Sequence, residues 1–405
     1  MTSNSTAPGG PATGPLTAYS LDQLRERHSV KWQEYPPGVL PLWVAEMDTP
    51  LAEPIAQTLV KAVTMGDTGY AFAGGLPEAF AAFADRRYGW RPDPDGIRLV
   101  PDVMAGIVEM LRLVTEPGDR VVFNTPAYPP YFYWLPRIDR EIVESPLALT
   151  STGFRLDLDA LERDFAAGAA AYLLCSPHNP TGLVFSEEEL LAVAELADRY
   201  GVRVVVDEIH APLVYPGARH VPFASLDAPA AARSVTLVSA SKAWNLAGLK
   251  AALAVAGEDS RDDVGAIHPE VSESAGLLGV LASETAFTAG EPWLDELVTG
   301  LDANRTLLKE LLSEHLPEVG YQPPQATYLA WLDFRACGLG DDPAEWFLRR
   351  GGVALYPGHK FGAPGRGYVR FNFATSAERV TEAVHQMSSS LSGRPGAGPA
   401  GLDAL

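Results

Sequence analysis

The chain has 405 residues, of which 47% are apolar and 20% are charged, an ordinary balance for a globular protein. This length exceeds what one hydrophobic core fills, so we expect two domains. The 51 acidic residues outnumber the 31 basic ones, and the resulting net charge of −20 argues against binding to nucleic acid or to an anionic membrane. The two cysteines, Cys175 and Cys337, form neither a disulfide framework nor a paired zinc motif, which suits a reducing cytoplasm.

The composition changes along the chain and suggests its divisions. Residues 1–18 are rich in small residues, Pro and Gly, and lack the basic and apolar parts of a secretory signal, so we expect a disordered tail there. A second tail is expected over 391–405. Between them the sequence predicts an N-terminal segment over 19–55, a large domain over 56–285 and a small domain over 286–390. We expect the N-terminal segment to pack with the small domain. No apolar run reaches the roughly 20 residues of a membrane helix.

Short apolar runs alternate with a helical pattern in the middle of the chain. The strand-like runs begin at Val121, Ala171, Val202 and Ser234. Between the second and third runs, Ser186 and Glu189 form a capping box that starts a helix, and Gly201 is placed to end it. Strand, helix and strand at this spacing predict an α/β fold whose central sheet is mainly parallel and covered on both faces.

Ligands of such sheets bind beyond the carboxyl ends of the strands. The polar residues at these ends are therefore the first candidates for a site: Asn179, Asp207, Ser239, Ser241 and Lys242. After about residue 285 the pattern changes to an amphipathic stretch over 292–315 and two strand-like runs over 326–334 and 367–375. This part is expected to form the smaller α+β domain.

Each candidate also has an ordinary structural explanation. Lys242 at a strand end in a covered cleft can lose its proton and react with a carbonyl cofactor, but a lysine after a strand is more often a surface residue. Asp207 could cap a helix, and Asn179 lies in an Asn-Pro turn. Arg370 lies within an apolar strand pattern, so it needs a carboxylate partner, either an Asp of the protein or a substrate. Cys175 suits a small buried apolar residue better than a nucleophile.

The order of the motifs is more specific than any one of them. SPHNPTG, VVVDEIH, SASKAWNLAG and PGHKFG…GYVRFNFA resemble, over residues 20–390, the fold-type I class I/II aminotransferase family, which depends on pyridoxal 5′-phosphate (PLP). The stretches VKWQEYPPGVLPLWVAEMDTPLAEPI, DEIHAPLVY and SKAWNLAGLK are similar to its C–S lyase branch, the bacterial cystathionine β-lyases. His210 and Lys250 stand where ordinary aminotransferases usually have Tyr and Arg, which also favours that branch.

The resemblance implies a role for each residue around the cofactor ring. Lys242 matches the lysine that holds PLP covalently and then removes the Cα proton of the substrate. Asp207 matches the carboxylate beside the pyridine nitrogen, where a buried anion favours the protonated ring. Asn179 matches the residue that hydrogen-bonds the phenolic oxygen, and His210 lies where aminotransferases place a second donor to it. Tyr128 matches the aromatic residue that stacks on the ring.

The resemblance also implies where the phosphate binds. Ser239 and Ser241 match phosphate ligands beside the lysine, and the N–H groups of Val103 and Met104 are expected at a helix N-terminus, which suits an anion. The family usually has Gly where this chain has Asp102. Because a carboxylate beside a phosphate is unfavourable, Asp102 must point away or cap the helix.

Further residues are implied at the edges of the site. Lys250 is placed to aid phosphate binding, and Tyr70 matches a tyrosine that reaches the phosphate of a neighbouring subunit, which implies an obligate homodimer with two shared sites. Arg370 matches the clamp for the substrate α-carboxylate, which orients the Cα–H bond. Trp43 and the backbone near Ala45 are expected to line the same pocket.

The resulting prediction is a PLP-dependent C–S β-lyase without a metal site, which cleaves L-cystathionine or related cysteine S-conjugates to a thiol, pyruvate and ammonia. The alternative is an aminotransferase that moves an amino group between an amino acid and a 2-keto acid. A DNA-binding regulator with an aminotransferase-like sensor is disfavoured, because only about 20 residues precede the resemblance. A nicotinamide dehydrogenase is disfavoured by the lack of a G-x-G-x-x-G after a strand.

Overall fold

The computed structural model describes residues 14–151 and 153–392. Its largest sheet has the strand order β2-β10-β9-β8-β7-β3-β4. Within the described residues, the strands of this sheet pair in parallel except for β10, which runs antiparallel to β2 and β9. The predicted, mainly parallel α/β sheet is therefore confirmed. The strands are β2 (Ile97–Val100), β3 (Arg120–Thr125), β4 (Glu141–Pro146), β7 (Ala169–Cys175), β8 (Arg203–Asp207), β9 (Val235–Val238) and β10 (Ala252–Ala256).

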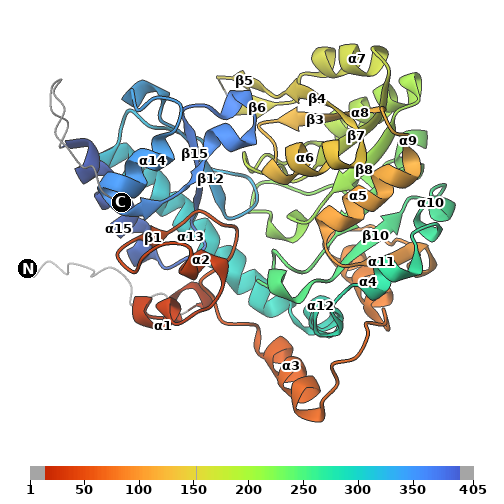
Figure 1. The fold of residues 1–405 in the computed structure, drawn as a ribbon, viewed down its shortest axis with the longest axis horizontal. Helices are drawn as coiled ribbons and strands as arrows, with labels where there is room; N and C mark the ends of the chain where they lie inside the picture. The colour runs from red at the N-terminus through yellow and green to blue at the C-terminus, as the bar shows by residue number, and fades with distance from the viewer. Residues whose placement is uncertain (1–13, 152, 393–405) are drawn as a thin grey trace, which may run out of the picture.

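Helices cover both faces of this sheet (Figure 1). In β8, Val204 and Val206 pack into the core on one face of the sheet, and Val205 packs into the core on the other. Both faces of the strand are buried, so its sequence is apolar without a break. Each buried side chain of this size contributes roughly 1.5–3 kcal/mol. One face holds α7 (Leu158–Ala166), α8 (Glu187–Tyr200) and α9 (Pro229–Ala232), and the other holds α5 (Val103–Val114), α6 (Pro129–Trp134) and α10 (Arg261–Gly265).

The helix α8 has the ends that its sequence predicts. The Ser186 hydroxyl accepts the N–H of Glu189 at 3.1 Å, and the Glu189 carboxylate accepts the N–H of Ser186 at 2.8 Å. Gly201 then ends the helix with a positive φ of 70°, a conformation that favours glycine. Both signals are local, which is why the sequence alone located this helix.

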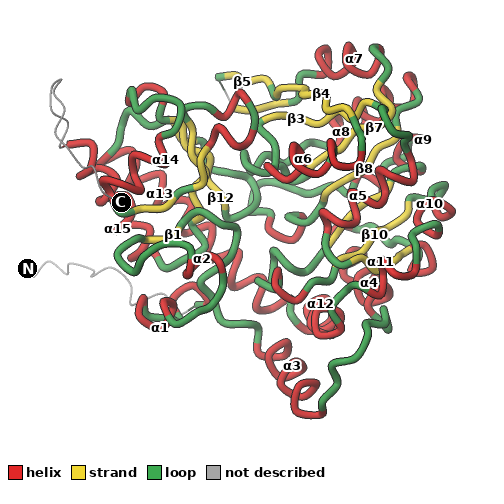
Figure 2. Tube along the Cα trace, viewed as in Figure 1, coloured by secondary structure: helices red, strands yellow, loops and turns green. Residues whose placement is uncertain are grey.

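A second sheet lies apart from the first (Figure 2), with the order β11-β12-β15-β14 and antiparallel pairing throughout its described strands. Its long helices α13 and α15 pack against each other. The N-terminal segment joins this region, because Leu40 and Pro41 pair in parallel with Val353 and Ala354. The elements are β11 (Gly320–Tyr321), β12 (Leu329–Asp333), β14 (Tyr356–Pro357), β15 (Tyr368–Asn372), β1 (Leu40–Pro41), β13 (Val353–Ala354), α1 (Leu21–Arg25), α2 (Val30–Gln33), α13 (Glu291–His315), α14 (Pro343–Trp346) and α15 (Ala377–Ser392).

An aromatic core lies where α4 and α12 pack against each other. Trp244, Phe83 and Phe287 meet edge-on or tilted, with ring centroids 5.1–5.7 Å apart. Next to them α3 packs on α12 and then extends away from the molecule (Figure 1). The remaining elements are α3 (Glu53–Met65), α4 (Leu76–Tyr88), α11 (Pro269–Glu273), α12 (Leu277–Ala289) and the hairpin β5 (Ala148–Thr150) and β6 (Gly153–Arg155). We keep the division of the domains at 285/286 as a proposal.

The expected tails are only partly within the described residues. Pro15–Thr17 forms a 3-10 turn, and its Leu16 is buried in the core beside α13. Residues 15–17, at the end of the predicted disordered tail 1–18, are thus part of the folded structure, because Leu16 anchors them in the core. At the other terminus α15 continues to Ser392, and residues 1–13 and 393–405 lie outside the described range. No helix in the described ranges is long and apolar enough to span a membrane.

Candidate functional site

A cavity of about 1170 Å³ opens beyond the carboxyl ends of β7, β8 and β9. The large sheet, the N-terminal segment and β15 of the second sheet all contribute to its lining, and the last two are joined by a hydrogen bond from Arg370 to the carbonyl oxygen of Trp43. The predicted residues that line it are Trp43, Ala45, Val103, Met104, Tyr128, Asn179, Asp207, His210, Ser241, Lys242, Lys250 and Arg370. Of the predicted site residues, Ser239 and Tyr70 lie outside this lining. Residues more than 300 positions apart therefore meet in one place.

Lys242 follows β9 and is partly exposed to the cavity. Its Nζ donates to the carbonyl oxygen of Ala45 at 3.2 Å. Burial, and then the charge of Arg370, lower the pKa of the Lys242 amine to about 8. A neutral amine is a nucleophile and a base, so this lysine is suited to react with a carbonyl group and to accept a proton near neutral pH.

The lowered pKa of Lys242 gives a first prediction. Competitive trace acetylation of the cofactor-free protein over a pH series should give Lys242 a midpoint near 8, because the reactive neutral form increases as the pH rises through the pKa. A lysine in an unstructured model peptide, labelled in the same way, has its midpoint at about 10.4. A midpoint for Lys242 equal to that of the model peptide would contradict the stated effect of burial.

Asp207 ends β8 with a buried carboxylate that faces the cavity. The Tyr131 hydroxyl donates to its Oδ2 at 2.7 Å, and the N–H of Ile209 donates to its Oδ1 at 3.2 Å. Burial raises the pKa of Asp207, while these two hydrogen bonds lower it. The charge of Lys242 also favours the ionised form of this carboxylate, and a cationic group of a ligand in the cavity would stabilise it further.

Arg370 lies on β15 with only 2% of its surface exposed. Its Nη1 donates to Asn179 Oδ1 and its Nη2 to the carbonyl oxygen of Trp43, both at 3.1 Å. The guanidinium also lies over the rings of Tyr356 and Phe361, at 4.8 and 5.1 Å from their centroids.

No aspartate or glutamate among residues 14–151 and 153–392 forms an ion pair with Arg370, and its buried Nε has no hydrogen-bond partner there. Of the two alternatives that the sequence leaves open for the partner of Arg370, a carboxylate of the protein is therefore the one that these residues contradict. The sequence pattern indicates only that the Arg370 guanidinium needs hydrogen-bond acceptors. The oxygens of Asn179 and Trp43 and the two aromatic rings provide some of these contacts without a negative charge. The other alternative, a carboxylate brought by the substrate, stays a prediction.

His210 and Tyr128 are neutral groups at the cavity wall. Burial lowers the pKa of His210 to about 3, and its Nδ1 has no hydrogen-bond partner among the described residues. Burial raises the pKa of Tyr128 to about 12. Tyr128 immediately precedes α6, and its ring meets that of Tyr131 edge-on, with the ring centroids 5.6 Å apart. Both side chains can therefore offer hydrogen bonds to a ligand without adding charge.

The N-terminus of α5 forms the end of the cavity where a phosphate is expected. Asp102 caps this helix by accepting the N–H of Ala105 at 2.8 Å, which is one of the two placements predicted for it. Its second oxygen accepts a hydrogen bond from Lys250 Nζ, also at 2.8 Å. The first N–H groups of a helix, here those of Val103 and Met104, have no partner within the helix and favour an anion.

Ser239 lies outside the lining of the cavity and holds the neighbouring backbone in place. Its hydroxyl donates to the carbonyl oxygen of Ala251 at 2.7 Å and accepts the N–H of Ser241 at 3.1 Å. The two bonds fix the turn that carries Ser241 and Lys242 into the cavity. Its predicted contact with a phosphate is not tested, and in the structure the hydroxyl serves the backbone.

The sequence reasoning missed the residues that hold the N-terminal wall in place. Asn372 Nδ2 donates to the carbonyl oxygens of Val44 and Glu46 at 2.7 and 2.6 Å. Asn245 accepts the N–H of Met47 and donates to its carbonyl, both at 2.9 Å. Both asparagines lie in the quoted motifs, but an asparagine side chain carries no sequence signal that it binds a distant backbone.

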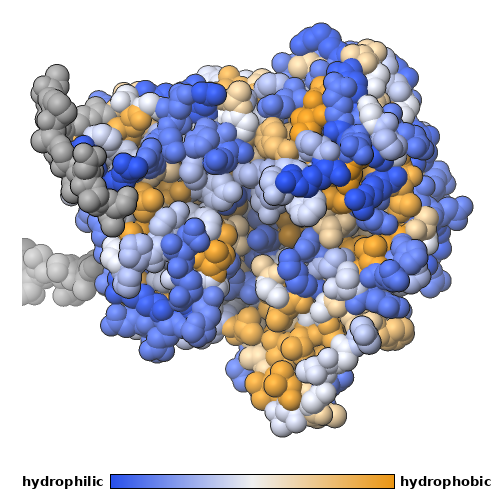
Figure 3. Space-filling model, in the orientation of Figure 1, coloured by the Kyte–Doolittle hydropathy of each residue, from blue (hydrophilic) through white to orange (hydrophobic). Residues whose placement is uncertain are grey.

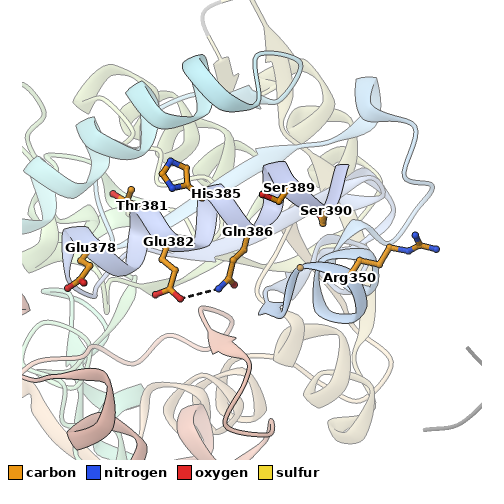
Figure 4. Close-up of a pocket in the computed structure, with 9 residues that line it drawn as sticks. Arg350, Glu378, Thr381, Glu382, His385, Gln386, Ser389 and Ser390 are labelled. Carbon is orange, nitrogen blue, oxygen red and sulfur yellow. Dashed lines mark hydrogen bonds between the residues drawn. The ribbon is translucent and has the colours of Figure 1, made fainter. Parts of the chain in front are cut away.

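A second, shallower cavity of about 560 Å³ lies on the surface between α15 and Arg350 (Figure 4). Glu382 and Gln386 face it and are joined by a hydrogen bond of 3.1 Å. None of the predicted site residues lies there. Among the described residues, no group of three or more His, Cys, Asp or Glu side chains is placed to hold a metal ion.

Comparison with known proteins agrees with this geometry. Residues 64–387 match the model of the family described as aminotransferase class I and II, and the chain belongs to this family. A Corynebacterium glutamicum protein named cystathionine beta-lyase is 37% identical over 380 residues, which cover 92% of this chain and 99% of that protein. A Mycobacterium tuberculosis protein, provisionally named a cystathionine beta-lyase, is 47% identical and covers 93% of this chain and 98% of its own.

A solved structure extends the likeness to three dimensions. A provisionally named PLP-dependent beta-cystathionase from Corynebacterium diphtheriae superposes with a TM-score of 0.88 at 38% identity, over 93% of this chain and 99% of that one. The fold is therefore that of the PLP-dependent aminotransferases, as the resemblance of the motifs implies.

Proposed function

We propose that this chain is a PLP-dependent C–S β-lyase that cleaves L-cystathionine or a related cysteine S-conjugate to a thiol, pyruvate and ammonia. The names of the relatives support the reaction. One observation of the site carries the proposal. The Lys242 amine with its lowered pKa, the buried Asp207 carboxylate and the Arg370 guanidinium without a carboxylate partner all face one cavity.

The cavity fits PLP group by group. Lys242 would hold the cofactor covalently, Asp207 would pair with its ring nitrogen, and Tyr128 would contact its ring. The Nδ1 of His210, which has no partner among the described residues, and the side chain of Asn179 would contact its polar edge. The remaining predicted contacts stay proposals for the phosphate: the N–H groups of Val103 and Met104, the hydroxyls of Ser239 and Ser241, and the amine of Lys250.

When bound, PLP withdraws electrons from the substrate Cα. The protein then has three tasks. Arg370 binds the substrate carboxylate, and the wall formed by Trp43 and Ala45 restricts how the substrate lies, so that the Cα–H bond is held near Lys242. The Lys242 amine, which would be freed from the cofactor when the substrate amine takes its place, would then accept the Cα proton. With a thiolate leaving group on Cβ, the electrons of that C–H bond form the Cα–Cβ double bond as the C–S bond breaks.

Purified enzyme and L-cystathionine, without any 2-keto acid, distinguish the lyase from the aminotransferase. A lyase releases pyruvate and thiol in equal amounts over many turnovers. An aminotransferase instead gives one turnover, bleaches its visible absorption, and recovers only when a 2-keto acid is added. Equal and sustained release supports the proposal, whereas a single turnover restored by a keto acid contradicts it.

The homodimer is part of the proposal and rests on α3 and the loop after it. Val60, Val63, Met65, Tyr70 and Phe72 are 58–89% exposed, and together they form an apolar surface, which we call the α3 patch. Apolar surface is concentrated over this helix in Figure 3. Isolated exposed apolar residues are common, but a contiguous patch marks an interface. We propose that a second copy of the chain covers it and receives Tyr70 at its own phosphate site.

The variant Val60→Asp/Val63→Asp should convert a dimer into a monomer, because two charges cannot be buried at an apolar interface without partners. Analytical ultracentrifugation checks the mass, and the affinity for PLP should fall with it if Tyr70 serves the partner. Leu149→Asp is the matched control, since Leu149 is 54% exposed on β5 and outside the α3 patch. If the double variant remains dimeric, the α3 patch is not the dimer interface.

The cytoplasmic location also stays a proposal.

A further inference from the structure

Tyr131 is a fully buried tyrosine on α6, and it is not among the residues predicted to contact the cofactor or the substrate. Its hydroxyl donates to Asp207 Oδ2 at 2.7 Å. The thiol of Cys175, at the end of β7, interacts with the same hydroxyl, and it donates a hydrogen bond to the carbonyl oxygen of Pro177 at 3.5 Å. The rings of Phe123 and Tyr128 pack edge-on against the Tyr131 ring, with centroids 5.7 and 5.6 Å away. Packing on several sides therefore fixes the direction in which the hydroxyl points.

We propose that Tyr131 is a positioning residue, which orients the Asp207 carboxylate and keeps it anionic as the partner of the cofactor's ring nitrogen. The inference rests on the proposed function, because only a PLP enzyme needs an anion at this place. Nothing in the relatives' names or in the motifs of the sequence points to Tyr131. It follows from the hydrogen bond and from the burial of both groups.

The charges of the three groups explain why a tyrosine suits this position. Burial raises the pKa of Tyr131 well above its usual range and raises the pKa of the Cys175 thiol, so both stay protonated. The series Cys175, Tyr131 and Asp207 then carries one negative charge, on the carboxylate. Burial opposes that charge, and the tyrosine hydrogen bond favours it. Without the hydroxyl, the carboxylate loses a donor and binds a proton more readily, which weakens its hold on a protonated ring.

The variant Tyr131→Phe removes the hydroxyl and keeps the ring. Two measurements on the protein test it: the dissociation constant of PLP by equilibrium dialysis, and the nitrogen-15 resonance of PLP labelled at its ring nitrogen. A hydrogen bond to a charged acceptor of this kind corresponds to roughly a 10- to 100-fold change in binding. We expect PLP affinity to fall by about that factor and the resonance to move towards that of an unprotonated pyridine.

Tyr172→Phe is the matched control. Tyr172 is equally buried, and its hydroxyl donates to Asn124 in the core on the opposite face of the sheet. The control should lower thermal stability without moving the resonance. If Tyr131→Phe also leaves the resonance and the PLP affinity at their wild-type values, the positioning role is overturned and the tyrosine is only a packing residue. If the wild-type protein takes up no PLP, the proposed function itself fails.

Discussion

Replacing Lys242 with alanine is expected to lower turnover of L-cystathionine by about 10²–10⁴-fold, the usual contribution of a positioned general base. Two functions are lost together, because the same amine holds the cofactor and removes the Cα proton. The variant should still bind PLP through the phosphate and ring contacts, but with the absorption spectrum of a cofactor that is not joined to a lysine. Steady-state kinetics and absorption spectra measure the two effects separately.

Two controls show whether the loss is specific. A small primary amine added to Lys242→Ala should restore part of the turnover, since it supplies the missing base to an otherwise intact cavity. Lys309→Ala, on the exposed side of α13, should leave kinetics and spectrum unchanged. Turnover by Lys242→Ala at the wild-type rate would show that another group removes the proton, and Lys250 in the same cavity is then the first candidate.

Replacing Arg370 with alanine should cost about 2–5 kcal/mol in substrate recognition, the usual effect of removing one member of a buried charge pair. This corresponds to a decrease in kcat/KM of roughly 30-fold to several thousand-fold. The effect should exceed that of Arg370→Lys, which keeps the charge but loses the fork that binds a carboxylate through two hydrogen bonds. Kinetics with L-cystathionine, and with an analogue that has an amide in place of the α-carboxylate, measure this.

The analogue supplies the decisive comparison. The wild-type enzyme should discriminate strongly against the amide, and Arg370→Ala should discriminate little, because the group that reads the carboxylate is gone. The variant should also raise the pKa of Lys242, since the charge of Arg370 is one of the causes that lower it. Unchanged discrimination in Arg370→Ala would mean that the carboxylate binds elsewhere.

The fold was predictable where its signals are local. The capping box at Ser186 and the positive φ of Gly201 are set by neighbouring residues, and the apolar runs of β3, β7, β8 and β9 follow from burial on both faces of the sheet. The antiparallel direction of β10 was not predictable, because it depends on how the chain returns to the sheet. The burial of Leu16 depends in the same way on a helix nearly 300 residues away.

The candidate site was likewise predictable only where its residues are marked by local sequence signals. Asn179, Asp207 and Lys242 end or follow strands of one sheet, so the sequence could place them together. Their roles around the cofactor were inferred from the resemblance of the motifs to a known family. The structure confirms only that these residues line one cavity. Asn245 and Tyr131 went unnoticed, because each acts through a contact with a distant residue that no pattern along the chain records.

The central claim is that Lys242 is the residue to which PLP is joined. Reduction of the PLP-loaded enzyme with borohydride makes that linkage permanent, and peptide mapping by mass spectrometry then locates it. The account predicts a single modified peptide that contains Lys242, and no modification in the variant Lys242→Ala. Modification at Lys250, which faces the same cavity, or no modified peptide at all, would contradict it.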